Sequence, residues 1–131
     1  MKRFFKPAQI AWSAPGQSHG LAHGAVFKRL LISGQPGIDS TGVAPPDLEA
    51  QIGLAFDNLL MVVVAGQMEP KDLVKVVAYV AAPGAFPLYE QVRKRKLEVP
   101  SLASTYVEVA GLSDPRWRVL IEGEAISDQG S

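Results

Sequence analysis

The chain contains no cysteine and only two histidines among its 131 residues. Without cysteine, disulfides, thiolate metal sites and a cysteine nucleophile are excluded. His19 and His23 stand four residues apart, but they lie in a glycine-rich stretch, and no third ligand follows at a suggestive spacing. We therefore expect no metal site and, because no nucleotide-binding motif is present, no cofactor.

An excess of charge is also lacking, because 13 basic residues balance 13 acidic ones. Because the net charge is zero, no overall electrostatic field attracts the chain to nucleic acid or to a membrane surface. The only basic run, residues 93–96, falls at the end of an expected helix, where successive side chains point about 100° apart instead of along one stripe. We therefore disfavour nucleic acid as a partner.

Targeting segments are lacking too. The first five residues have no apolar signal-peptide core, and no stretch approaches the length of a membrane span. We expect a cytoplasmic protein that has no membrane partner and forms one domain over residues 1–131.

The clearest element that is present is a helix over residues 47–65. Asp47 is expected to be its N-cap, and Gly66 is its natural stop. Apolar residues recur at three- and four-residue steps between them, which predicts one core-facing stripe. A second helix is expected over residues 85–97.

Runs of apolar and β-branched residues predict the strands. We expect a short edge strand over residues 2–5, and a hairpin of strands 21–27 and 30–33 with Lys28 and Arg29 in its turn. Strand 73–81 should run parallel to an earlier strand through a right-handed crossover. Strands 104–109 and 119–125 are expected to form a second hairpin. The result is an α+β two-layer sandwich, with two helices on one face of a mixed five- to six-stranded sheet.

The other face of this sheet has no cover within the chain. Glu122 and Glu124 stand two residues apart on one side of their strand, and their repulsion excludes that side from an apolar core. A face that mixes such glutamates with apolar side chains is expected to meet another subunit.

Three segments carry a family resemblance. Residues 31–35 read Leu-Ile-Ser-Gly-Gln, residues 104–112 read Ser-Thr-Tyr-Val-Glu-Val-Ala-Gly-Leu, and residues 121–126 read Ile-Glu-Gly-Glu-Ala-Ile. Their order and spacing resemble the reactive-intermediate deaminase (Rid) family, which is also called YjgF-like or endoribonuclease L-PSP. The resemblance implies a chorismate-mutase-like sandwich and a homotrimer that binds small-molecule ligands in clefts between its subunits.

In that family, an arginine grips the carboxylate of a small imine or enamine acid, and a glutamate on the last strand positions the attacking water. Glu124 matches this glutamate and is the candidate catalytic residue. Ser104 stands in the place of the arginine, which argues against classical 2-imino acid deaminase activity. The resemblance implies six candidate ligand-binding residues: Ser33, Gly34, Glu90, Ser104, Thr105 and Tyr106.

Purely structural roles are the alternative to these functional ones. Glu124 could form an interface salt bridge, and Glu108 could pair across strands with Arg116 or Arg118. A replacement arginine could come from a neighbouring subunit, with Arg29, Arg93 and Arg95 as candidates.

Three functions remain open. The first is a divergent Rid trimer that binds a small metabolite and hydrolyses an imine-type intermediate. The second is a non-catalytic ligand-sensing or protein-interaction trimer, and the third is an endoribonuclease.

Overall fold

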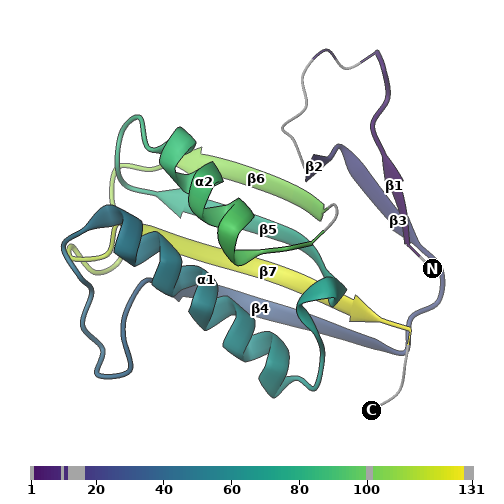
Figure 1. The fold of residues 1–131 in the computed structure, drawn as a ribbon, viewed down its shortest axis with the longest axis horizontal. Coiled ribbons are helices and arrows are strands. Elements are labelled where there is room, and N and C mark those ends of the chain that lie inside the picture. The colour runs from purple at the N-terminus through teal and green to yellow at the C-terminus, as the bar shows by residue number, and fades with distance from the viewer. Residues whose placement is uncertain (1, 10, 12–16, 100–101, 129–131) are drawn as a thin grey trace.

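The computed structural model describes residues 2–9, 11, 17–99 and 102–128. Two helices cover one face of a five-stranded sheet with the order β2-β6-β5-β7-β4, as Figure 1 shows. The sheet consists of β2 (Gln17–Ser18), β4 (Lys28–Pro36), β5 (Leu73–Val80), β6 (Leu102–Glu108) and β7 (Val119–Ser127). The helices are α1 (Leu48–Ala65) and α2 (Phe86–Lys96), with a 3-10 turn, η1, at Pro70–Asp72. The predicted α+β fold class is confirmed.

The first helix forms where the sequence predicts it. Asp47 caps it by accepting a hydrogen bond from the Ala50 backbone N–H at 2.9 Å, and Gly66 ends it by donating to the Val62 carbonyl. Its buried stripe includes Phe56 and Leu59, which are fully excluded from solvent against the sheet. This burial is the main source of the helix's stability.

By length and composition alone, α1 is apolar enough to cross a membrane, with a mean hydropathy of 1.6 over 18 residues. The expectation that no stretch approaches this length was wrong. Because α1 packs its buried side on the sheet, we interpret it as a core helix.

As predicted, strand 73–81 (β5) runs parallel to an earlier strand, β4. The two strands are not neighbours in the sheet. β5 is parallel to its neighbour β6 and antiparallel to β7, and β7 is antiparallel to β4. β4 and β5 therefore run the same way, with β7 between them (Figure 1).

The predicted hairpin of strands 104–109 and 119–125 was wrong, because β6 and β7 lie on opposite sides of β5. The ten residues that connect them exceed the usual length of a hairpin loop. Gln51 in α1 holds this connection by donating to the Arg116 carbonyl at 3.0 Å and accepting from the Arg118 N–H at 2.9 Å. The chain thus crosses the end of β5 before it re-enters the sheet.

The predicted N-terminal hairpin was also wrong. Residues Gly20–His23 form β3, which pairs with β1 (Lys2–Phe5) in a separate two-stranded sheet. Lys28 and Arg29 do not turn; they begin β4 opposite Ser127 and Ile126 of β7. The Lys28 ammonium fixes this start by donating to the Gly66 and Gln67 carbonyls beyond the end of α1. The edge strand expected over residues 2–5 is present as β1.

Candidate functional site

The register of the sheet sorts its residues onto two faces. On the open face, one row across the strands reads Leu31, Glu124, Lys75 and Ala103, and a second row contains Glu122, Val77 and Thr105. On the helix-covered face, the corresponding rows are Ile32, Gly123, Val76 and Ser104, then Ile121, Ala78 and Tyr106. Directly opposed residues share a face, and neighbours along a strand do not.

The predicted site residues therefore fall on both sides of the sheet. Glu124 and Thr105 lie on the open face, whereas Ser104 and Tyr106 lie beneath the helices. Within one chain, Ser104 and Glu124 are separated by the sheet itself and by β5. A cleft that includes both residues needs a second chain.

Glu124 has a partner within its own chain. The Arg29 Nε donates to Glu124 Oε2 at 2.8 Å, and the two side chains are 57% and 26% exposed. This hydrogen bond and the carboxylate charge raise the pKa of Arg29. Lys75 stands directly opposite Glu124 on β5 and is exposed. Glu124 is thus a half-buried carboxylate flanked by two cations.

Glu122 has a different environment on the same face. The Tyr79 hydroxyl donates to Glu122 Oε1 at 2.8 Å. Accepting this hydrogen bond is the main way in which Glu122 raises the pKa of Tyr79, and partial burial adds to it. Sequence analysis did not single out Tyr79, although its alternation with Lys75 and Val77 places it on the same side of β5.

Ser33 and Gly34 lie at an irregularity in β4. The register with β7 shifts between Ile32 and Gln35, so that β4 carries one extra residue there. A Cβ at Gly34 would lie 2.7 Å from the Leu120 side chain, so glycine leaves room for that leucine. Ser33 is exposed, and its carbonyl accepts a hydrogen bond from the Gln35 side chain at 3.0 Å.

The remaining candidates form an aromatic and ionic cluster under α2. The Tyr106 ring packs against Phe86 and Tyr89, with centroid distances of 5.0 and 5.1 Å. Burial raises the pKa of Tyr89, while the neighbouring Ser104 hydroxyl and the Arg93 charge act against this increase. This cluster fills the helix–sheet interface.

Glu90 belongs to the same cluster and is paired within it. The Arg93 guanidinium donates to both Glu90 oxygens, at 2.8 and 3.1 Å, and the Arg93 side chain is only 3% exposed. Arg93 is therefore committed inside its own chain and is a poor donor to a neighbouring subunit.

The predicted pairing of Glu108 was wrong. Its carboxylate accepts a hydrogen bond from the Gly84 backbone N–H at 3.1 Å. Arg116 pairs with Asp114 at 2.7 Å, and Arg118 donates to the Pro46 carbonyl. The reason is that β6 and β7 are not neighbours, so no cross-strand contact forms between them.

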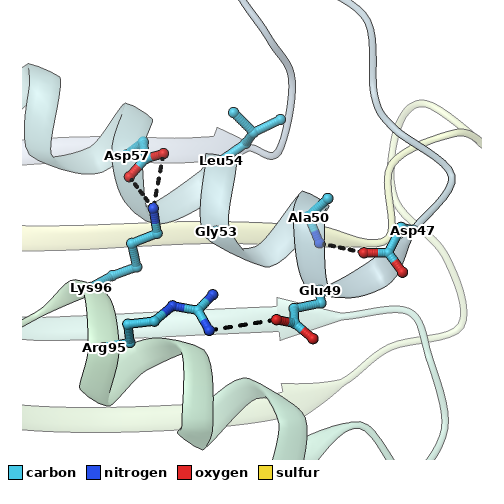
Figure 2. Close-up of a pocket in the computed structure, with 8 residues that line it drawn as sticks. All are labelled: Asp47, Glu49, Ala50, Gly53, Leu54, Asp57, Arg95 and Lys96. Atoms are coloured by element: carbon cyan, nitrogen blue, oxygen red, sulfur yellow. Dashed lines mark hydrogen bonds and ion pairs between the residues drawn. The ribbon is translucent and has the colours of Figure 1, made fainter.

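A groove of about 270 Å³ lies between the two helices (Figure 2). Its charges pair across it, with Arg95 3.5 Å from Glu49 and Lys96 3.0 Å from Asp57. Figure 2 shows these side chains pointing toward each other from α2 and α1. We interpret the groove as an ionic link between the helices, and Arg95, like Arg93, is engaged within its own chain.

Within the described ranges, no three histidine, aspartate or glutamate side chains gather in a way that could hold a metal ion. The functional groups that the open face offers are carboxylates, cations, the Thr105 hydroxyl and the Tyr79 phenol.

Comparisons with known proteins agree with this fold. The family model described as Endoribonuclease L-PSP matches residues 13–127. The crystal structure of YyfB from Yersinia pestis, a Rid family protein of unknown function, has a TM-score of 0.83 and 26% identity, covering 95% of this chain and 98% of that one. The YjgF product of E. coli has a TM-score of 0.70 and 26% identity, covering 92% and 91%.

A third solved structure is that of E. coli TdcF with bound serine. Its TM-score is 0.71 at 20% identity, covering 95% of this chain and 98% of that chain, which shows the shared fold. No curated protein matches the chain.

Proposed function

Because the chain belongs to the endoribonuclease L-PSP family, also called the Rid or YjgF-like family, we propose that it forms a homotrimer that binds a small metabolite between its subunits. The observation that carries the proposal is the open sheet face. It exposes 66% of Leu31, directly opposite Glu124, and 38% of Val107 two rows further along the sheet. A sheet face that mixes apolar side chains with fixed charges suits a subunit contact that encloses a polar cleft.

The reaction that fits this cleft is hydrolysis of an imine or enamine. Water adds to the imine carbon, the carbon–nitrogen bond then breaks, and a carbonyl compound and ammonia are released. Glu124 is the proposed group that orients the water, because a carboxylate within hydrogen-bond reach can accept its proton. Glu122 is the alternative, since Tyr79 holds its carboxylate in place on the same face.

A non-catalytic binding protein is the second candidate. The serine bound in the TdcF structure supports small-molecule binding by this fold, which is all that a sensor needs. Such a sensor would use the same cleft without turnover. Ribonuclease activity remains third, since the described face presents no cluster of cations along a groove.

Assembly is tested first. Light scattering after gel filtration is expected to give three times the 14.0 kDa of one chain. A folded monomer at micromolar concentration would remove the cleft and the proposal with it. The proposal also treats residues 1–131 as one domain. It assumes a cytoplasmic location, which fractionation of the native host checks.

Activity is tested with freshly generated 2-aminoacrylate. We expect the Glu124→Gln variant to lose about 10²-fold or more in rate if Glu124 orients the water. If Glu122→Gln instead loses activity and Glu124→Gln keeps it, Glu122 is the residue that orients the water. Binding of serine with no turnover of 2-aminoacrylate would favour the sensor.

A further inference from the structure

The charges of the chain are unevenly distributed along the sequence. Residues 1–38 contain five of the 13 lysines and arginines and no aspartate or glutamate. All 13 acidic residues lie in residues 39–131, where only eight basic residues accompany them. The zero net charge, on which the expectation of no membrane partner rests, hides this asymmetry. Such a separation of charge is typical of chains in which one segment binds an anionic partner.

Three of the five cations belong to a two-stranded ribbon at the N-terminus. Lys2 and Arg3 lie in β1, which pairs only with β3, and Lys6 follows directly. Figure 1 shows β1 and β3 set apart from the main sheet. Phe4 and Phe5 stand between the cations and are 44% and 40% exposed. We call β1, β3 and Lys6 the N-terminal ribbon.

Strand alternation divides the side chains of the ribbon between an inner and an outer face. Lys2 is on the inner face, because its ammonium donates to the Lys71 carbonyl on the body of the protein at 2.9 Å. Arg3 and Phe5 are on the outer face with Ala22, which stands opposite Arg3 and is exposed. The Arg3 guanidinium lies over the Phe5 ring, 5.6 Å from its centroid. The outer face thus presents a cation and an aromatic ring together.

The ribbon has no acidic residue of its own, and the carboxylates found beside it lie on its inner side. Three of them line one hollow together with Lys2, namely those of Glu69, Asp72 and Asp128. In contrast, neither Arg3 nor Lys6 forms an ion pair with a described residue. The positive charge of these two side chains is therefore not neutralised by a described carboxylate.

This combination suits an anionic membrane surface better than a nucleic acid. A single strand of nucleic acid binds on a row of open aromatic faces. Phe4 and Phe5 are successive residues that point to opposite faces, and Arg3 covers one side of the Phe5 ring, so no such row forms. A membrane interface needs only an exposed ring that enters the headgroup layer and cations that meet anionic lipids.

We propose that the N-terminal ribbon binds reversibly to the surface of a membrane that contains anionic lipids. Phe5 enters the interface, and Arg3 and Lys6 lie among the lipid headgroups. Because only a few charges and one ring take part, the binding is peripheral and sensitive to salt. It does not depend on the cleft of the proposed function.

The test is co-sedimentation of the full chain with vesicles at millimolar lipid. Phosphatidylcholine vesicles with about one third phosphatidylserine should bind the protein at least about 25-fold more strongly than pure phosphatidylcholine vesicles, and high salt should abolish the difference. The double variant Arg3→Gln, Lys6→Gln should lose about 25-fold, because each cation near an anionic surface contributes about 5-fold.

The matched control is the double variant Lys94→Gln, Arg95→Gln. It removes one lysine and one arginine from exposed positions of α2, where Glu49 pairs with Arg95. The control should bind phosphatidylserine vesicles like the parent protein. Circular dichroism of each variant checks that the fold is retained.

Insertion of the ring is measured with Phe5→Trp. The fluorescence that this variant adds to that of the parent protein should shift to shorter wavelength when phosphatidylserine vesicles are added. Phe5→Ala should weaken binding by about 3- to 10-fold, since it removes most of the apolar surface that enters the interface. Met61→Ala, which truncates a side chain that is 61% exposed on α1, should leave binding unchanged.

The outcomes separate this inference from the proposed function. If the protein does not bind phosphatidylserine vesicles, the proposal is wrong, and binding of single-stranded oligouridylate in their place would identify a nucleic acid partner. If the Arg3 and Lys6 double variant binds like the parent, or the α2 control loses as much, the ribbon is not the binding surface. An unshifted Phe5→Trp signal in the bound protein would show that the ring stays outside the membrane. None of these results bears on the cleft, which light scattering and 2-aminoacrylate turnover test.

Discussion

The side-chain oxygen of Gln51 accepts a 2.9 Å hydrogen bond from the backbone N–H of Arg118, 67 residues further along the chain. The Gln51 amide also donates to the carbonyls of Pro45 and Arg116. One buried side chain thus joins the loop before α1 to the connection that leads into β7. It is the polar link that lets β7 enter the sheet beside β5.

Replacing Gln51 with leucine should destabilise the fold strongly. The apolar side chain leaves three backbone groups without their partners in a site where Gln51 is only 1% exposed. We expect a loss of at least about 2 kcal/mol in the free energy of unfolding, measured by urea denaturation. Gln91→Leu, at an exposed position of α2, is the control and should change stability little. Equal effects of the two substitutions would contradict this role.

Gly37→Ala should be similarly damaging, for a steric reason. A Cβ at Gly37 would overlap the backbone carbonyl of Gln51, and backbone cannot move aside as a flexible side chain does. We expect a loss of about 2 kcal/mol or more, seen as a lower thermal midpoint. Gly24→Ala, where a Cβ meets nothing within 4 Å, should leave the midpoint unchanged.

Asp114 should titrate far below an ordinary aspartate. The Arg116 side chain and backbone N–H groups donate to its carboxylate and lower its pKa to about 2. Its contribution to stability is therefore complete above about pH 4 and is lost as the pH falls toward 2. Carbon-detected NMR of the carboxyl should show this midpoint, and Arg116→Ala should raise the pKa toward that of an ordinary aspartate. A midpoint near 4 in the parent protein would show that the ion pair does not persist in solution.

The Tyr79–Glu122 contact predicts a shift in a phenol titration. Glu122 raises the pKa of Tyr79 in two ways: its carboxylate accepts a hydrogen bond from the Tyr79 hydroxyl, and its negative charge disfavours the phenolate. Glu122→Gln removes the charge, so the pKa of Tyr79 should fall, which NMR of the labelled Tyr79 ring reports. The matched control is Glu108→Gln, because Glu108 raises the pKa of Tyr106 instead. An unmoved Tyr79 signal in Glu122→Gln would show that the open-face contact is absent.

Sequence reasoning predicted what depends on local pattern. The α1 bounds follow from Asp47, Gly66 and an apolar stripe of helical period, all of which lie within one stretch of chain. Strand alternation alone also places Thr105 on the face opposite Ser104 and Tyr106, as the structure does. The two-layer architecture followed from the count of amphipathic elements and from the motif resemblance.

What sequence reasoning missed depends on which strands are neighbours. The Arg29–Glu124 and Tyr79–Glu122 contacts join strands that are far apart in the chain, and both exist only because β7 lies between β4 and β5. The false hairpin of residues 104–125 assumed that sequential strands pair. The Gln51 contacts that carry the chain across β5 give no signal in a linear pattern.

The place of β7 between β4 and β5 has a consequence for how the protein is made. β4 has no other partner in the five-stranded sheet, so it cannot join the remaining strands until β7 has been synthesised. A chain that has been translated only as far as β6 holds β4 apart from β5, β6 and β2, and the part of α1 that packs on β7 has no cover. Adding β7 then joins β4 to the other strands in one long-range step, which favours slow, cooperative folding over stepwise folding as the chain grows.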